Sequence, residues 1–441
     1  MQRRPLTISF FLLLGWIVTW VIYQPGLSGG FLFDDFPNLE KIGALGPITN
    51  LELFQAYLRS GFAGPTGRPI SLASFLLNAN DWPAPPGPFK NTNLLIHLLI
   101  GVLLFPTVRK ALRATGYARN EADWIALLAA GLWLLNPFLV STTLYVVQRM
   151  TQLATLFCVI GILGYLQGRS WLPIRPLLAY ATMSVSVVLA TFLAVFSKEN
   201  GALLPTLILS IEVALKFHWT HPGPDWRWKT VFLGIPSAVI LVYLAMRLPS
   251  LQQPISTREF TLLERLWTEP RLLWDYLYHL FVPHIQTKGL YHDGRTLSTG
   301  PFTPWTTLPA LFGLVGLIAG SWLVRKRWPL ISLAVLFFFA GHLLESTTIA
   351  LELYFEHRNY LPAAFLFVPV AAGILWLRKH LDFVVVVFLA LTLTGSYAFT
   401  TWQRSKLWGN EVELMLVWAE TNQLSPRAQN TAAQTWLRLG H

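Results

Sequence analysis

Two adjacent carboxylates, Asp34 and Asp35, lie in the stretch FLFDDFPNL, a few residues beyond the first long apolar run. We expect the neighbouring Phe31, Phe33 and Phe36 to hold the pair in a poorly hydrated pocket, where an unpaired charge is costly and therefore usually functional. Burial and mutual repulsion would raise the pKa of one carboxylate, which suits a group that accepts a proton. The pair therefore predicts a general base for a substrate hydroxyl. The alternative is that both residues cap a loop helix or face water.

The chain around the pair has the composition of a membrane protein. Of its 441 residues, 54% are hydrophobic and only 12% are charged, which is too much apolar surface for ordinary soluble domains. About eleven apolar stretches are long enough to cross roughly 30 Å of hydrocarbon. They lie at 6–23, 93–108, 124–141, 150–167, 177–196, 202–217, 230–247, 305–324, 329–345, 359–377 and 382–401. We therefore expect an all-α polytopic membrane protein.

Lysine and arginine predict how these spans are oriented. With the N-terminus in the cytoplasm, the inner loops are VRKALRATGYAR, GRSWLPIR, KFHWTHPGPDWRWK, VRKRWP and LRKH, all short and basic. Together with the N-terminus they hold 16 of the 33 lysine and arginine residues, so the net charge of +11 reflects membrane topology and not nucleic-acid binding. An odd number of spans places the C-terminus outside. The single cysteine, Cys158, lies within a span, so no internal disulfide is expected.

The expected outer face is more elaborate than the inner one. It carries two long loops, 24–92 and 248–304, and a C-terminal tail, whereas the inner loops are all short. Function should therefore lie outside. The second loop contains FTLLERLWTEPRLLWDYLYHLFVPHI, whose leucine and tryptophan spacing predicts a helix on the outer membrane surface, broken or kinked at Pro270.

The tail predicts a helical hairpin. Its first helix should end near Asn422, and Ser425 followed by Pro426 is a good N-cap and first-turn pair for the second helix. We therefore divide the chain into a membrane module, residues 1–401, and an outer C-terminal hairpin, residues 402–441.

An ordered set of motifs carries a family resemblance. The set is FLFDDFPNL, GRPISLASFLLN (67–78), NTNLLIHLLIGVLLF (91–105), NPFLVSTTLYVVQRMTQLATLF (136–157), FSKENGALLPTLIL (196–209), EHRNYLP (356–362) and the terminal hairpin. Together these motifs resemble the GT-C membrane glycosyltransferases, in particular the tetratricopeptide-containing protein O-mannosyltransferases and their bacterial relatives. The chain is also similar to the bacterial pilin glycosyltransferases, including those that attach arabinofuranose. It departs from the mannosyltransferase branch in having Asn136-Pro137 in place of His-Pro, and in having one hairpin in place of a repeat array.

The resemblance implies a reaction and its partners. Such enzymes transfer a sugar from a polyprenyl phosphate or pyrophosphate to an acceptor on the outer side, here a protein hydroxyl on the periplasmic side of a bacterial inner membrane. One Asp would deprotonate the acceptor and the other would orient it, with inversion at the anomeric carbon. The resemblance favours Asp34 as the base, whereas the residues alone do not rank it against Asp35. No cofactor is implied with certainty, and a divalent cation bridging carboxylate and phosphate is left open.

An anionic donor phosphate needs positive charge at headgroup depth, and arginine can bind it through two parallel hydrogen bonds. We expect Arg149, Lys198 and Arg358 to bind the phosphate and Arg68 to position the Asp pair. Each cation could instead be an anchor at a helix end. The expected supporting residues are Arg68, Glu199, Glu356 and His357.

Other polar residues are expected to have structural roles. Glu352, His292 and Asp293 are expected to be structural, and His97, in the middle of a span, to form a hydrogen bond between helices.

Three other classes of protein remain open. A polysaccharide polymerase or ligase would share the topology and the lipid-linked donor but use a glycan acceptor. A secondary transporter would be expected to show an internal repeat and charges at mid-membrane. A scaffold would use the hairpin only to recruit a partner.

Overall fold

The regular structure of this chain is entirely helical. The computed structural model describes residues 3–44, 46–253, 260–287 and 289–440, and these residues contain no β-strand. The first helices are α1 (Arg3–Tyr23), α2 (Asp35–Leu39), α3 (Leu51–Arg59), α4 (Pro69–Phe75), α5 (Pro86–Ala114), α6 (Arg119–Leu134), α7 (Val140–Leu144), α8 (Arg149–Trp171), α9 (Pro176–Val195) and α10 (Leu204–Ala214). They are followed by α11 (Trp226–Lys229), α12 (Ile235–Ala245), α13 (Leu262–Phe281), α14 (Thr307–Val324), α15 (Pro329–His342), α16 (Val368–Leu377), α17 (Phe383–Gly409), α18 (Glu411–Thr421) and α19 (Pro426–Arg438).

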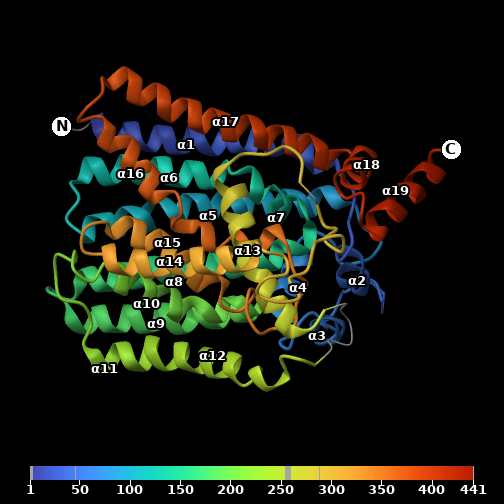
Figure 1. The fold of residues 1–441 in the computed structure, drawn as a ribbon, viewed down its shortest axis with the longest axis horizontal. Coiled ribbons are helices and arrows are strands. Elements are labelled where there is room, and N and C mark those ends of the chain that lie inside the picture. Colours follow the sequence, from blue (N-terminus) through green and yellow to red (C-terminus); the bar gives the residue numbers. More distant parts are fainter. Residues whose placement is uncertain (1–2, 45, 254–259, 288, 441) are drawn as a thin grey trace.

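The long helices lie roughly parallel in one bundle (Figure 1). Seven described helical segments are long and apolar enough to cross a membrane, or eight if the bent pair α6 and α7 counts as one. The seven are Thr7–Ser28, Pro86–Ala114, Val146–Trp171, Pro176–Val195, Trp226–Ser250, Thr307–Val324 and Phe383–Gly409. The chain is thus a multi-pass membrane protein.

The predicted number of eleven spans is not confirmed, although the predicted runs fall largely on helical segments. The difference arises at α10, α15 and α16, which are shorter than a full span. Short helices are tolerated inside a bundle because neighbouring helices can satisfy their freed backbone groups.

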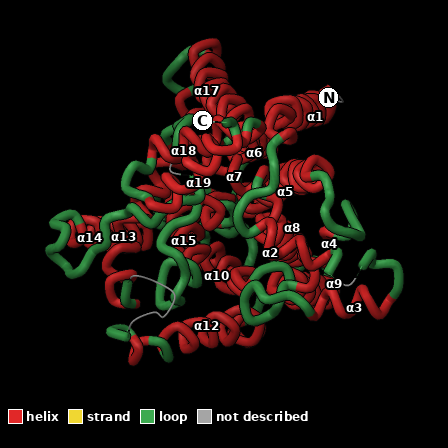
Figure 2. The backbone as a smooth tube through the Cα atoms, turned by 90° about the vertical axis from the view of Figure 1, so that its right-hand side faces the viewer, coloured by secondary structure: helices red, strands yellow, loops and turns green. Residues whose placement is uncertain are grey.

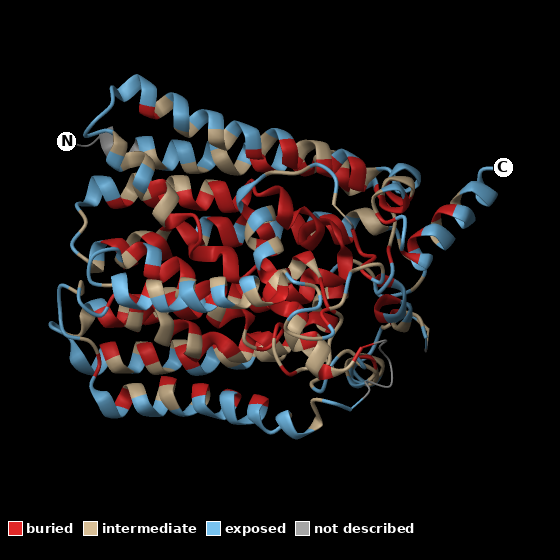
Figure 3. Cartoon of the chain, in the orientation of Figure 1, coloured by how far each residue is buried: buried red, intermediate tan, exposed pale blue. Residues whose placement is uncertain are grey.

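The bundle has a closely packed interior and an apolar exterior. α8 lies at the centre, because 83% of its most apolar 18-residue stretch is buried inside the protein. The corresponding share is 11% for α1 and 17% for α17. α1 and α17 lie on one side of the bundle and α12 lies on the opposite side (Figures 1 and 2). Large apolar side chains such as Val239 of α12 and Phe388 of α17 are exposed. Both helices are largely coloured as exposed in Figure 3. Such exposure is expected where a helix faces lipid.

The two ends of the bundle differ. The N-terminus lies at one end with the five basic loops, while α2, α3, α18 and α19 gather at the other end (Figure 1). Two of the basic loops are joined directly, since the Thr220 backbone N–H donates to the Ala114 carbonyl. The expected elaborate face is therefore present as one end of the molecule, called the outer end below. Which side of a membrane it faces stays a prediction.

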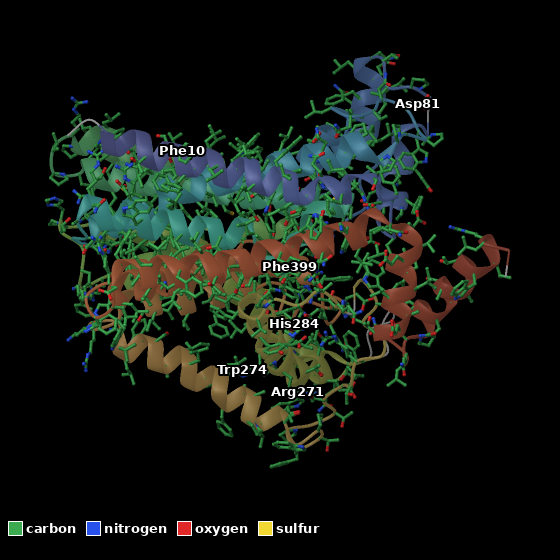
Figure 4. All side chains as sticks on the ribbon, turned by 90° about the horizontal axis from the view of Figure 1, so that it is seen from above. Phe10, Asp81, Arg271, Trp274, His284 and Phe399 are labelled. Atoms are coloured by element: carbon green, nitrogen blue, oxygen red, sulfur yellow. The ribbon has the colours of Figure 1, made fainter. Side chains whose placement is uncertain are left out.

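α13 lies at a steep angle to the spanning helices (Figure 1). It begins with a capping box, in which Thr261 and Glu264 satisfy each other's backbone N–H groups. The helix continues through Pro270, so of the predicted break or kink the break does not occur and the kink stays a prediction. Trp274, labelled in Figure 4, attaches α13 to α14 by donating to the Ala310 carbonyl at 3.0 Å.

The C-terminal hairpin is confirmed as α18 and α19. Ser425 caps α19 as predicted, because its hydroxyl accepts the Ala428 N–H at 3.1 Å. α17 continues to Gly409, beyond the predicted module boundary at residue 401.

Candidate active site

A broken segment between α6 and α8 forms the base of the site. The chain bends by 50° between α6 and α7. Asn136 stabilises this bend: its side-chain oxygen accepts the Phe138 N–H at 2.9 Å, and its amide group donates to the Leu280 carbonyl on α13 at 3.0 Å. All residues from Asn136 to Leu156 are buried. The segment therefore presents Tyr145 and Val147 as fixed groups beneath the first outer loop.

Asp35 is an anchor. It is completely buried, and its two carboxylate oxygens accept the Val147 N–H at 2.7 Å and the Leu32 N–H at 2.9 Å. Burial raises the pKa of Asp35 to about 7, although these hydrogen bonds and nearby Lys90 oppose the shift. A carboxylate that holds two backbone groups and has no exposed surface is suited to fixing the loop and not to meeting a substrate.

Asp34 is the accessible member of the pair. Its residue is exposed, and its backbone N–H donates to the Tyr145 hydroxyl at 2.8 Å. Its side chain does not cap α2, so the capping alternative does not describe it. Phe33 adopts a left-handed backbone with φ of 41°, which turns the chain sharply just before Asp34. The expected poorly hydrated pocket therefore applies to Asp35 and not to Asp34.

Arg149 is not placed to bind a phosphate. It is completely buried, and its guanidinium donates to Asn93 and Asn78 side chains at 2.7 Å and to the Ser74 and Phe89 carbonyls at 2.8 and 2.9 Å. These bonds tie α4 and the start of α5 to α8. The predicted phosphate contact is corrected accordingly: a phosphate would have to displace internal hydrogen bonds in a site with no access.

Arg68 binds a carboxylate other than the predicted pair. Its guanidinium contacts both oxygens of Glu199, with a shortest distance of 2.7 Å, and both side chains are partly exposed. Arg68 itself has a left-handed backbone with φ of 54°. The expectation that Arg68 positions the Asp pair is thus corrected, and the ion pair instead joins the first loop to the turn that follows α9.

Lys198 lies at the edge of a buried charge cluster. Its ammonium is 2.9 Å from a Glu345 oxygen and donates to the Thr151 hydroxyl at 3.0 Å. Burial lowers the pKa of Lys198, although Glu345 opposes the shift. Thr151 is on α8, four residues beyond Val147, which binds Asp35. One short stretch of chain therefore contacts both the Asp pair and this cluster.

Arg358 and His357 complete the cluster. Arg358 is buried and donates to the Leu353 carbonyl at 2.9 Å, and it lies close enough to Lys198 to affect its ionisation. His357 is partly exposed and stacks on Phe355 with ring centroids 5.0 Å apart. Burial, followed by Lys198 and Arg358, holds the pKa of His357 well below its ordinary value, so the imidazole is neutral.

The cluster carries an excess of positive charge among the residues that the structure describes. Besides the pairs of Arg68 with Glu199 and of Lys198 with Glu345, the completely buried Arg265 contacts Glu269 at 2.7 Å. Arg358 interacts with Glu269 and Glu345, which already have these partners. Four cations thus face three carboxylates. A buried surplus charge is costly unless an anion joins it.

Glu356 binds a cation outside the cluster. It forms a buried ion pair with Arg404 of α17, with 2.8 Å between the charged groups. This pair holds the turn before Arg358 against α17. Glu356 is therefore structural in its contacts, and Arg404 is a partner that the sequence analysis missed.

The second outer loop and the hairpin close over the first loop. Phe33 contacts Tyr291 with ring centroids 4.8 Å apart, and Tyr291 contacts Trp418 of α18 at 5.8 Å. Asp293 accepts a hydrogen bond from Ser425 at 2.7 Å. Three segments distant in sequence are thus in contact beside Asp34. Figure 2 shows α18 and α19 from this end of the molecule.

A cavity of about 360 Å³ lies between the first loop and the hairpin. Its lining includes Phe31, Phe33 and Phe36 on one side and Asn430 and Arg438 of α19 on the other. Phe36 is 42% exposed, so an aromatic surface is available next to the candidate base.

Several residues confirm or extend the sequence analysis. His97 forms the expected contacts between helices, with 2.6 Å to the Tyr360 hydroxyl and 3.0 Å to the Leu134 carbonyl. Lys90, completely buried beside Asp35, and Tyr145 were not singled out. Tyr145 belongs to the motif 136–157 and Lys90 directly precedes the motif 91–105, but only the folded chain brings them to the Asp pair.

The described part of the chain contains no group of three or more His, Cys, Asp or Glu side chains that could hold a metal ion. A cation shared between one carboxylate and a substrate phosphate needs fewer protein ligands, so chelation during an activity assay is the appropriate test.

Comparison with known proteins gives one distant likeness to report. No family model and no curated protein matches the chain. Among solved structures, the oligosaccharyltransferase of Archaeoglobus fulgidus, tethered by a disulfide to an acceptor peptide with the NVT sequon, is similar over 93% of this chain. The identity is 12% and the TM-score 0.46, and the chain spans 56% of that protein. A likeness at this level decides neither family nor activity, so the proposal below rests on the geometry of the site.

Proposed function

We propose that this chain is a membrane glycosyltransferase of GT-C type. It transfers a hexosyl or pentosyl group from a polyprenyl-phosphate or pyrophosphate donor to a protein hydroxyl on the periplasmic side of a bacterial inner membrane. The observation that carries the proposal is that one stretch of chain, residues 145–151, contacts both the Asp pair and the cation cluster. Asp34 supplies an accessible carboxylate, and the cluster supplies an excess of positive charge.

The cation cluster supports a phosphate donor. Lys198 and Arg358, with the neutral His357 beside them, are the side chains we assign to the phosphate. The excess of one positive charge favours a polyprenyl phosphodiester, which carries one negative charge, over a pyrophosphate, which carries two. Arg68, held by Glu199, lies at the edge of the same cluster.

The chemistry assigned to Asp34 is a direct displacement. Asp34 takes the proton of the acceptor hydroxyl as its oxygen attacks the anomeric carbon. The bond between that carbon and the phosphate oxygen breaks, and the lipid phosphate leaves with the bonding electrons into the cation cluster. The configuration inverts because attack and departure occur on opposite faces. Asp35 orients the reaction by fixing the loop, and Asp34 leaves the step protonated.

The outer loops and hairpin support a macromolecular acceptor. The cavity between the first loop and α19 is lined by Phe33, which precedes Asp34 in the chain. It offers an aromatic side and a hydrogen-bonding side, which suits a peptide segment of a protein such as a pilin. The sugar and the acceptor sequence are to be identified by assay.

A transfer assay tests the proposal. The purified protein in lipid nanodiscs is incubated with radiolabelled polyprenyl-phosphate sugar and a candidate pilin, and Asp34→Asn serves as the control. Label on the pilin that is lost in the control supports the proposal. Label on a glycan would instead mean a polymerase or ligase, and donor that crosses a vesicle membrane unchanged would mean a transporter.

A further inference from the structure

Tyr145 occupies a position directly beneath the candidate base. It follows α7, has an extended backbone with ψ of 112°, and is only 2% exposed. Its neighbours along the chain are equally buried, so the ring has little freedom to move. Its hydroxyl nevertheless reaches the exposed residue Asp34.

The hydroxyl makes two contacts with the same residue. Its oxygen accepts the Asp34 backbone N–H at 2.8 Å. The oxygen is the acceptor in that bond, so the phenol proton is free to be donated elsewhere. The Asp34 carboxylate is its side-chain partner. One phenol therefore holds both the backbone and the side chain of Asp34.

The stretch from Tyr145 to Val147 grips the two carboxylates differently. Val147 uses its backbone N–H to hold the buried Asp35, and Tyr145 uses its side chain to hold the exposed Asp34. The bond between Val147 and Asp35 thereby fixes the position of the loop on the bundle, whereas Tyr145 fixes the orientation of the Asp34 side chain. A loop turned by the strained backbone of Phe33 needs both constraints to present one carboxylate in one orientation.

We propose that Tyr145 is a positioning residue that orients the Asp34 carboxylate toward the acceptor and keeps it ionised through a donated hydrogen bond. This inference rests on the proposed function. A hydrogen bond to the charged form of a carboxylate favours that form, so the phenol lowers the pH at which Asp34 becomes an effective base. It also removes rotamers that would point the carboxylate away.

The charged groups around the pair come from four elements among the described residues. Asp35, the first residue of α2, follows Asp34, Lys90 of α5 faces Asp35, and Glu411 of α18 faces Lys90. Arg427 and Arg438 of α19 line the cavity that Phe33 also lines. Tyr145→Phe leaves all of these side chains in the chain. A change in the pH profile of such a variant therefore reports the lost hydrogen bond.

The first test is Tyr145→Phe in the full chain, with Tyr57→Phe as the matched control. Tyr57 is also buried in the outer region, and its hydroxyl has no hydrogen-bond partner among the described residues. We expect kcat of Tyr145→Phe to fall about tenfold. The donor KM should stay within about twofold, since the phenol does not contact the cation cluster. The acid limb of the plot of kcat/KM against pH should move to higher pH, and the control should match the wild type.

The second test is difluorotyrosine incorporated at position 145, which keeps the shape of the ring but makes its hydroxyl a stronger donor. The acid limb should then move to lower pH, opposite to Tyr145→Phe. This variant decides the question even if Tyr145→Phe fails to fold.

Two outcomes separate the inference from the proposed function. An unchanged acid limb in both variants, in an enzyme that Asp34→Asn inactivates, would overturn the role of Tyr145 and leave the proposed base in place. Full activity of Asp34→Asn would overturn both.

Discussion

At the scale of single residues, the two carboxylates have opposite environments. Both oxygens of Asp35 accept backbone N–H groups in a site without exposure, whereas Asp34 is exposed and bound by a phenol. Holding the loop and meeting a substrate are distinct tasks, and the proposed function assigns them to the adjacent residues Asp35 and Asp34.

Asp34→Asn should therefore lower turnover, whereas Asp35→Asn should lower stability. Asp34→Asn keeps its size but cannot accept a proton, so turnover should fall roughly 10²–10⁴-fold while the thermal midpoint and donor binding hold. Asp35→Asn places an amide N–H against a backbone N–H and should lose about 1–3 kcal/mol of stability. Transfer rate and thermal midpoint, measured side by side, check both. Near-wild-type turnover per folded molecule for Asp34→Asn would contradict the assignment.

Two of the three predicted phosphate ligands, Arg149 and Lys198, should respond differently to substitution. Arg149→Met removes a cross-link of internal hydrogen bonds and should lower stability without a selective effect on the donor. Lys198→Met combined with Glu345→Gln removes a buried pair together, and should raise the apparent donor KM about tenfold or more through loss of a charge-assisted contact. Donor titrations on folded protein measure the difference. An unchanged donor KM in the double variant would return Lys198 to a structural role.

At the scale of elements, the outer end is built from pieces that depend on one another. The hairpin packs through Trp418 against Tyr291 of the second loop, which in turn contacts Phe33 of the first loop. Deleting the hairpin would thus disturb the candidate active site as well as any docking surface. Part of the cavity face of α19 can be changed alone, because Asn430 and Arg438, two of its four cavity-lining side chains, are exposed.

Filling the cavity should impair acceptor use selectively. Asn430→Trp places a large side chain opposite Phe33 and Phe36, and the acceptor KM should rise about tenfold while donor binding stays unchanged. The control is Gln434→Trp on the same helix, an exposed position that does not line the cavity. Equal effects of both variants, or none from Asn430→Trp, would place the acceptor elsewhere.

At the scale of the whole molecule, charge and architecture agree. The five basic loops share one end with the N-terminus, and the elaborate loops share the other end with the hairpin (Figure 1). The lipid-facing helices expose apolar side chains between these ends. The buried cluster around Lys198 and Arg358 lies toward the outer end, and the buried ion pair of Arg169 with Glu212 lies at the basic end. Such a separation is what a bilayer requires of a single chain.

Reporter fusions test the orientation. A reporter placed after Arg327, in the loop between α14 and α15, should report the cytoplasm, and one at the C-terminus should report the periplasm, since basic loops are retained inside. Whole cells carrying phosphatase or fluorescent fusions provide the measurement. A cytoplasmic C-terminus would contradict the placement of the candidate site outside.

The sequence by itself determined the class of this protein, because apolar run length and basic loops reflect the bilayer directly. It also located the Asp pair, the hairpin with its Ser425 cap and the role of His97, which depend on local chemistry. Only the tertiary structure decided which carboxylate is accessible, because that depends on Tyr145 and Val147, more than a hundred residues away. For the same reason, only the structure showed that Arg149 donates to internal acceptors contributed by α4 and α5. An arginine at the start of a helix has the same sequence pattern whether its guanidinium meets solvent or such internal acceptors.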